Sequence, residues 1–374
     1  MSTLDRYIAR QFLTNVIALF VILFSFIVVI DASLNIDEFY RLAGRLGSPD
    51  GVDATGTLRR ILVTVVLIAD YWWPKLLQLH NFLLGLIMVG AMGFTFSQMT
   101  RNREFVAMMA AGVSLRRVIR PVMLVALALT ALQIINQELI LPRIAPLLVR
   151  DHNSAGEYKL GVSSVPLTLD GQGRLFRAAS FDADTDTLEG VYILERDADG
   201  RASRVVTADS ATYENGAWVF TNGQSRLRGP SLISPPTPIG RLESSLDPNE
   251  LRINRFESYS QAMSFSQASQ MLRRETLVDP KKRARYERIQ WGRFSMMASG
   301  VLSLLISAPF YLTREPKNMV VQSLKCAPVA IVALVGGVLG ASASIPGLPA
   351  SIGVFIPVMI LSVVAVAQTS SLKT

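Results

Sequence analysis

Few residues in this chain have the types and spacing that covalent or metal chemistry requires. The 374 residues include one cysteine and two histidines, His80 and His152, which excludes a disulfide framework and a thiolate metal cluster. The sequence holds no G-x-x-x-x-G-K-[ST] loop for nucleotide phosphates and no G-x-S-x-G or H-E-x-x-H pattern. It therefore predicts no catalytic residue, no metal site and no cofactor bound by this chain.

Isolated carboxylates flank the apolar stretches of the sequence. Asp31, Asp37, Glu38 and Glu138 all lie near such boundaries. We expect them to be solvated span ends, without a charge partner in mid-membrane. A chain of buried ionisable groups for proton coupling is therefore not predicted.

Residues 101–121, RNREFVAMMAAGVSLRRVIRP, predict a short amphipathic helix followed by a second helix. Asn102 is expected to cap the first helix, Glu104 lies in its first turn, where a negative charge is favourable, and Ser114 is expected to cap the second helix. An apolar face and a glycine stop are formed by four residues: Phe105, Met108, Met109 and Gly112. Two interpretations are open: a helix lying on lipid, or a helix that docks in a groove of a cytoplasmic partner.

The elements that would position this helix are membrane spans. Half of the residues are hydrophobic and only 18% are charged, against ~25% charged in a typical soluble domain. The net charge of +8 fits either nucleic acid or an anionic lipid, so the placement of apolar residues decides. Phe12–Ile30 carries no charge. It is long for a signal peptide and no small-residue cleavage site follows it, so we interpret it as a transmembrane helix.

Residues 58–96 predict two helices rather than one. The sequence Tyr71-Trp72-Trp73-Pro74 predicts a break, because aromatic residues favour the membrane interface and proline favours the first turn of a new helix. We expect residues 58–71 to form an amphipathic helix in the interface and residues 76–96 to form the second span.

Four more apolar stretches bring the number of predicted spans to six, at residues 121–141, 289–312, 326–344 and 348–368. The segment between the third and fourth spans alternates apolar and polar residues. Its turn signals are four dipeptides: Asp170-Gly171, Asp199-Gly200, Asn215-Gly216 and Asn222-Gly223. Trp218 and Phe220 are expected in the core of this segment.

The predicted fold class is an α-helical membrane protein with six transmembrane helices and an inserted all-β, jelly-roll-like domain. Residues 1–142 would hold the first three spans with the short helix at 102–112, residues 143–284 the β-domain, and residues 285–374 the last three spans. Lysine and arginine are concentrated in the loops after the second and fourth spans and are missing from residues 343–349. The positive-inside rule therefore places both termini in the cytoplasm and the β-domain outside it.

Five stretches, in this order, resemble the LptF/LptG permease family of lipopolysaccharide export. They are LDRYIARQFL (residues 4–13), IDEF (36–39), WWPKLLQLHNFLLGLIMVGAM (72–92), REFVAMMAAGVSLRRVIRP (103–121) and LEGVYILERDADGRASRVVTADSATYENGAWVF (188–220). The two N-terminal stretches are similar to the LptG branch. The order of the stretches, more than any one of them, carries the resemblance.

The resemblance implies an inner-membrane permease of an ABC-type exporter, with a periplasmic β-domain. Such a permease pairs with a homologous, LptF-like second permease above a cytoplasmic dimer of LptB-type ATPase subunits, which use the ATP. The pair extracts lipopolysaccharide and passes it to LptC-like and LptA-like periplasmic jelly rolls. Nucleic acid is not an expected partner.

The resemblance also implies roles for particular residues. The coupling helix that meets the ATPase would be formed by Glu104, Phe105, Met108, Met109 and Gly112. Basic residues near the outer ends of spans are candidates, by position only, for contact with lipid phosphates: Arg41, Arg45, Lys75, Arg143, Lys281, Lys282, Arg283 and Arg285. Each basic group near an anionic surface contributes ~1 kcal/mol.

Two departures from the family pattern bear on the cargo. Before the fourth span the family tends to have a basic pair followed by proline, whereas residues 290–294 read QWGRF, with Arg293 alone. Asp31 stands where a basic residue is expected. A permease for another anionic envelope lipid is therefore one alternative. A membrane-anchored β-domain scaffold, without transport or an ATPase partner, is the other.

Overall fold

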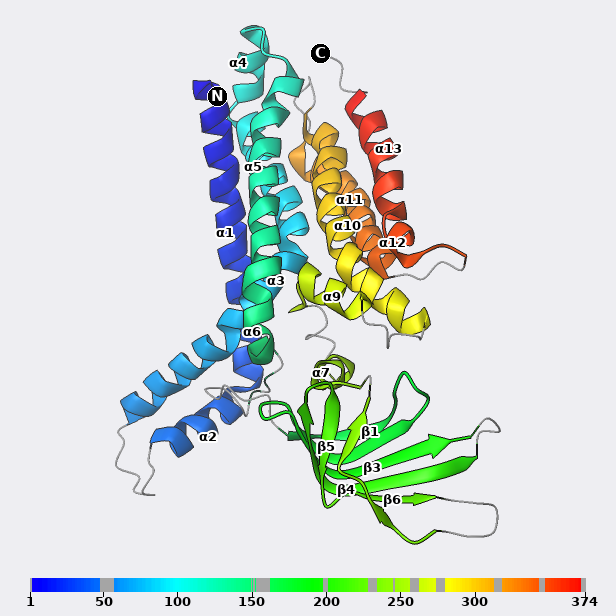
Figure 1. Ribbon diagram of the computed structural model, residues 1–374. Coiled ribbons are helices and arrows are strands. Elements are labelled where there is room, and N and C mark those ends of the chain that lie inside the picture. Colours follow the sequence, from blue (N-terminus) through cyan, green and yellow to red (C-terminus); the bar gives the residue numbers. More distant parts are fainter. Residues whose placement is uncertain are drawn as a thin grey trace. The chain divides into compact units, whose positions relative to one another are not determined.

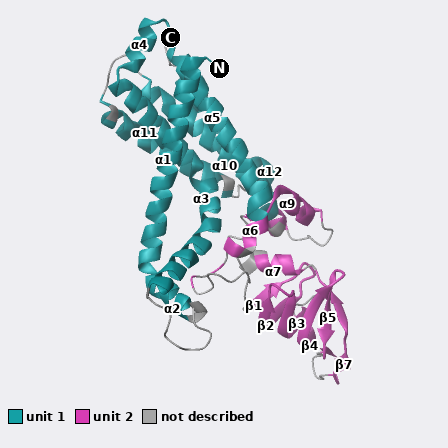
Figure 2. Ribbon diagram, turned by 90° about the vertical axis from the view of Figure 1, so that its left-hand side faces the viewer, with its two compact units in different colours: residues 1–142, 284–374 teal, residues 143–283 magenta. Residues whose placement is uncertain are grey.

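The computed structural model describes residues 2–47, 57–148, 150, 152, 162–197, 201–227, 234–244, 246–255, 262–273, 280–312, 318–342 and 347–370 (Figure 1). These residues separate into two compact units (Figure 2). The helical unit comprises residues 1–142 and 284–374, and the inserted unit comprises residues 143–283. The predicted Asp199-Gly200 turn lies outside the described residues.

The helical unit is built from long apolar helices and a few short ones. Its elements are α1 (Thr3–Leu34), α2 (Ile36–Gly47), α3 (Thr57–Arg101), α4 (Glu104–Ala110), α5 (Leu115–Ile135), the π-helix η1 (Asn136–Ile140), α10 (Pro280–Tyr311), α11 (Met319–Ser342), α12 (Ala350–Gly353) and α13 (Ile356–Ser370); α6 (Leu141–Leu148) crosses the boundary at residue 142. In the described part of the chain, six helices are long and apolar enough to cross a membrane. The predicted fold class, with six spans and an inserted β-domain, is confirmed.

The predicted break before Pro74 is wrong, because α3 is one helix that contains Pro74. A proline inside a membrane helix is tolerated where neighbouring groups satisfy the freed backbone. Trp72, predicted for an aromatic belt, is buried, and its Nε1 donates to Asp31 Oδ2 of α1 at 3.0 Å. At 1.5 Å per residue, the 45 residues of α3 far exceed a hydrocarbon layer of ~30 Å. Its first half must therefore extend beyond the layer, where α2 packs against it.

Glycines bring three spans of the helical unit close together. A Cβ added at Gly85 of α3 would lie 3.2 Å from Gly300 Cα of α10, and one at Gly337 of α11 would lie 2.5 Å from Ser299 Cβ of α10. Small residues allow this approach, which is how helices associate in lipid. Gly336, beside Gly337, has open space instead.

The inserted unit contains an antiparallel sheet. Its strands are β1 (Val162–Leu169), β2 (Leu175–Asp182), β3 (Thr187–Arg196), β4 (Ala202–Glu214), β5 (Ala217–Thr221), β6 (Gln224–Leu227), β7 (Thr237–Pro238) and β8 (Arg241–Glu243), followed by α7 (Pro248–Arg255) and α9 (Phe265–Leu272). Strands β1 to β5 pair consecutively, β8 pairs with β5, and β6 pairs with both β4 and β7. The long strand β4 therefore carries β5 and β6 along one edge.

One predicted turn dipeptide has the expected backbone, whereas at Asp170-Gly171 the positive φ lies at Gly173 instead. Asn215 and Gly216 both have positive φ, at 49° and 82°, as a tight hairpin between β4 and β5 requires. At Asn222-Gly223 the return strand breaks into β5 and β6. A Cβ on Gly223 would meet the Ile239 carbonyl oxygen, so this position requires glycine.

Trp218 is the largest fully buried side chain of the inserted unit. It is 0% exposed, its Nε1 donates to the Leu246 carbonyl at 2.8 Å, and its ring meets that of Tyr213 edge-on. Phe220 is also buried in the same cluster. The expectation that these aromatic residues form the core is confirmed.

We expect Trp218→Ala to destabilise the inserted unit by about 3–5 kcal/mol, because it removes a fully buried indole. Trp218→Phe keeps a ring but leaves the Leu246 carbonyl without its donor, at a cost of about 1–3 kcal/mol. The control is Tyr192→Ala on β3, where the residue is 37% exposed, with a smaller expected loss of about 1 kcal/mol. Limited proteolysis of the full-length chain across a urea series measures all three. If Trp218→Ala resisted proteolysis at the same urea concentrations as the wild type, the placement of Trp218 in the core would be contradicted.

Candidate functional site

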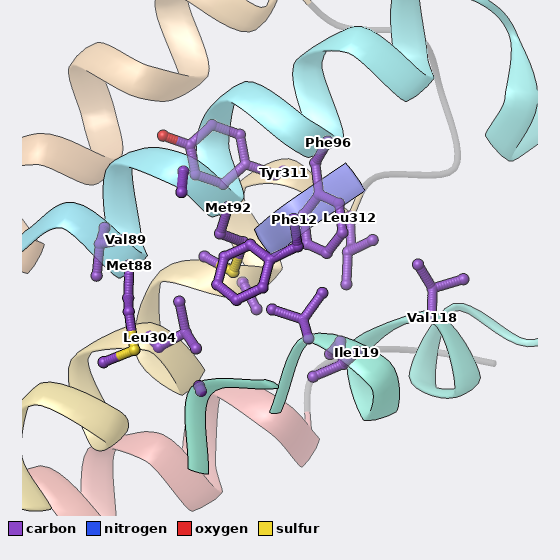
Figure 3. Close-up of a cluster of buried hydrophobic side chains, with 14 of the residues drawn as sticks. Phe12, Met88, Val89, Met92, Phe96, Val118, Ile119, Leu304, Tyr311 and Leu312 are labelled. Atoms are coloured by element: carbon purple, nitrogen blue, oxygen red, sulfur yellow. The ribbon is translucent and has the colours of Figure 1, made fainter. Parts of the chain in front are cut away.

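Helix α4 is held against the spans by its own apolar face. Phe105 is 4% exposed and Met108 is 8% exposed, and both belong to one buried cluster with residues of α1, α3, α5, α10 and α11. The Phe105 ring meets Phe96 of α3 edge-on, with centroids 5.7 Å apart. Figure 3 shows side chains of this cluster converging, among them Phe12 and Phe96. Phe105 and Met108 therefore fix α4 to this chain, and Met109 is half-buried beside them.

The two ends of α4 are set by backbone conformation. Gly112 has φ +77° and ends the helix, as predicted. The predicted cap, Asn102, is wrong: Arg103 is at the N-cap position with φ 55°, and no side chain caps the helix there. Ser114 is at the N-cap position of α5, also without a side-chain cap bond.

Glu104 is held in place by two neighbours. Its Oε1 accepts hydrogen bonds from the Tyr7 hydroxyl of α1 at 3.1 Å and from Asn102 Nδ2 at 3.0 Å. Within the described residues, Oε2 accepts none. The bond to Tyr7 ties the beginning of α4 to the beginning of the first span, and one carboxylate oxygen remains for another donor.

The face of α4 that points away from the buried cluster is small and uncharged. It is formed by four exposed residues: Val106, Ala107, Ala110 and Ala111. Val106 is 50% exposed. Small side chains leave the helix surface open to close approach by another surface, and basic residues border it at Arg101 and Arg103.

A groove of about 740 Å³ lies between α1, α3 and α11. Its walls are almost entirely apolar, with side chains such as Leu19, Phe26, Phe94 and Val320, and none of the described residues that line it is charged. Large side chains nearby are exposed, including Ile22 at 66% and Phe26 at 63%. Such a surface suits acyl chains or another apolar helix.

A buried amide cluster joins α3 to the end of α5 and to η1. Asn81 Nδ2 donates to Gln137 Oε1 at 2.6 Å, Asn136 Nδ2 donates to Asn81 Oδ1 at 2.9 Å, and Gln133 Nε2 donates to the Asn81 carbonyl at 2.7 Å. Asn81 and Gln133 also line a cavity of about 320 Å³ between α3, α5, α10 and α11. In an apolar environment these side chains must bond to one another, so they fix the register of the helices.

Glu138 has a charge partner, contrary to the sequence-based expectation. Its Oε1 lies 2.7 Å from Arg293 Nη1, and the two side chains are 23% and 8% exposed. Both residues lie within candidate spans. The pair therefore links the third span to the fourth, next to the amide cluster. Sequence reasoning missed it because 155 positions separate the two residues.

The basic residues proposed for lipid phosphates are divided between the two units. Lys75 is half-buried, with Nζ 3.5 Å from the centre of the Tyr71 ring. Arg41 is exposed, and its Nε donates to the Asp37 carbonyl at 3.3 Å. The other described members are Arg285, which is half-buried, and Arg143, Lys281 and Arg283, which are exposed. The side chains of Arg45 and Lys282 lie outside the described residues. The phosphate contacts stay a prediction.

Side chains of the types that bind metal ions do not form a cluster in the described part of the chain. No group of three or more His, Cys, Asp or Glu side chains there is placed to hold a metal ion. Cys326 is a buried free thiol.

We expect Glu138→Gln to destabilise the helical unit by about 3 kcal/mol, because Arg293 stays buried without its counter-charge. Replacing both residues by methionine removes both charges together, so it is expected to recover most of that loss. Thermal unfolding of the detergent-solubilised chain measures both. Equal stability of Glu138→Gln and wild type would show that the pair contributes nothing.

The comparison with known families covers most of the chain. The family described as "Lipopolysaccharide export system permease LptF/LptG" matches residues 52–369. No curated protein matches the chain. The matched range includes α3 to α13 and the whole inserted unit. The chain therefore belongs to the LptF/LptG family of lipopolysaccharide export permeases, which are multi-pass inner-membrane transport proteins and not enzymes.

Proposed function

We propose that this chain is one of two homologous permease subunits of an ABC-type exporter that extracts lipopolysaccharide from the inner membrane. The sequence has no P-loop, so ATP hydrolysis takes place on a separate, LptB-type dimer. The N-terminal stretches at residues 4–13 and 36–39 favour the LptG branch, with an LptF-like chain as the second permease. Both termini and α4 are then cytoplasmic, and the inserted unit is periplasmic.

The packing of α4 is the observation that carries this proposal. Its buried face is joined to five spans through the cluster around Phe96 and Phe105. Its opposite face, at Val106 and Ala110, is exposed. A helix attached to the spans on one side and open on the other is suited to transmit the motion of a docked ATPase. An interfacial helix that only rests on lipid would need its apolar face turned outward instead.

The groove between α1, α3 and α11 supports the transport part of the proposal. It is apolar and about 740 Å³ in volume, and exposed apolar residues border it on α1 and α11. Acyl chains and the spans of the second permease would share this surface. Gly336 of α11 has open space and allows another helix to approach.

The inserted unit supports a handover to similar periplasmic domains of the LptC and LptA type. In the described residues β1 pairs with β2 alone, so it is an edge strand. Leu167 on β1 is 60% exposed. An exposed edge strand is a site where another sheet can add a strand.

We expect Val106→Asp to abolish copurification of the ATPase while the chain stays folded. Val106 is half exposed, so the change alters the docking face and spares the buried cluster. A charge buried in such an interface costs at least ~2 kcal/mol, a loss of about 30-fold in affinity. The measurement is the ratio of ATPase to permease after affinity purification from the native membrane, with size-exclusion profiles to confirm folding.

The matched control is Val106→Thr, which keeps the shape of the side chain and is expected to retain the ATPase. A second variant, Glu104→Arg, changes the charge beside the same face and should also weaken the complex. If both charged variants retain the ATPase at the wild-type ratio, α4 is not the coupling helix. If no ATPase copurifies with wild type, the scaffold alternative is favoured; a bound lipid other than lipopolysaccharide favours the alternative cargo.

A further inference from the structure

A second groove on the helical unit combines apolar walls with basic side chains. It lies between α5, α10 and α13 and has a volume of about 670 Å³, within the ~300–1,000 Å³ of typical ligand sites. Its apolar walls come from six residues: Ile119, Met123, Leu124, Leu127, Leu305 and Val366. Its polar end is formed by Arg116, Arg120, Thr369 and Ser370.

The arginines occupy one end of the groove because of their helical spacing. Arg116 and Arg120 are one turn apart on α5, and Leu124 and Leu127 continue the same side of the helix. The groove therefore changes from basic to apolar along the axis of a membrane span. Among the described residues, no charged side chain lines the groove beside α1 or the cavity at Asn81.

Among the described residues, no carboxylate pairs with either of the two guanidinium groups. Arg116 and Arg120 are both exposed. Like charges one helical turn apart repel each other. Their neighbour Arg117 differs, because it interacts electrostatically with Asp5 of α1. An anion placed between Arg116 and Arg120 would remove that repulsion.

We propose that this groove binds a phospholipid with an anionic headgroup. The phosphate lies at Arg116 and Arg120, and an acyl chain lies along Leu124, Leu127 and Val366. Leu124 is 53% and Val366 is 69% exposed, so the site opens directly to the surrounding lipid. It is distinct from the groove between α1, α3 and α11, and it does not depend on the proposed export partnership.

The site is also next to the coupling element in sequence. Four residues separate α4, which ends at Ala110, from α5, which begins at Leu115. Arg116 is in the first turn of α5. A lipid bound there would neutralise the charge of the arginines that follow the connection between α4 and α5. The lipid composition of the membrane would therefore influence this connection.

The test is native mass spectrometry of the full-length, detergent-solubilised chain titrated with phosphatidylglycerol or with phosphatidylcholine of the same acyl chains. We expect phosphatidylglycerol to bind about 30-fold more tightly, the factor given by two basic groups that face a net anionic headgroup and not the zwitterionic headgroup of phosphatidylcholine. Arg116→Gln combined with Arg120→Gln should abolish that preference. Arg117→Gln, with the same change of side chain on the same turn, should keep it.

Two further arms test the position of the lipid. Val366→Trp fills the apolar part of the groove and should weaken binding of both lipids several-fold, while glycerol phosphate without acyl chains should not bind measurably. Equal loss of the preference in Arg117→Gln would show diffuse attraction and overturn the site. So would equal binding of the two lipids, tight binding of glycerol phosphate, or wild-type binding by Val366→Trp.

Discussion

The packing of α4 into the buried cluster of the helical unit is the interaction on which the rest of that unit depends. Phe105 and Met108 contribute to the same buried cluster as Phe12, Phe96 and Leu304. Interiors packed at this density do not deform continuously, so a displacement on one side is passed to neighbouring elements. Movement of α4 must therefore move the spans it touches or break that cluster. Packing alone therefore couples the position of α4 to the positions of these spans.

Polar groups inside the membrane impose a second constraint on the same unit. The amide side chains of Asn81, Gln133 and Asn136 have no water to bond in hydrocarbon, so their bonds to one another fix α3 against the end of α5. The π-helix η1 places Glu138 where it meets Arg293. Such local π segments occur frequently at functional sites. They reshape a helix without ending it, which suits a span that leads into an inserted domain.

The sequence predicted the spans well because each needs about 20 apolar residues in a row, a local property. It predicted the hairpin at Asn215-Gly216 for the same reason. What it missed depends on tertiary contacts. Periodicity showed that Phe105 and Met108 share a face, but it did not show that this face meets Phe96 of the same chain. Pro74 suggested a break that the packing around α3 overrides, and the partner of Glu138 is too distant in sequence to be recognised from a pattern.

In this chain, apolar surfaces contribute affinity for a lipid, whereas basic residues would select its headgroup. Burial of acyl chains in the groove between α1, α3 and α11 is non-directional and cannot distinguish lipids with equal chains. Because none of the described residues that line that groove is charged, selection of a phosphorylated headgroup has to come from basic groups beyond them or from a second chain. Arg293 is paired with Glu138. Its charge is therefore not available to a lipid headgroup while the pair is intact. Headgroup recognition therefore has to come from basic residues outside this groove, such as Arg41 and Lys75 at the span ends, or from a second chain.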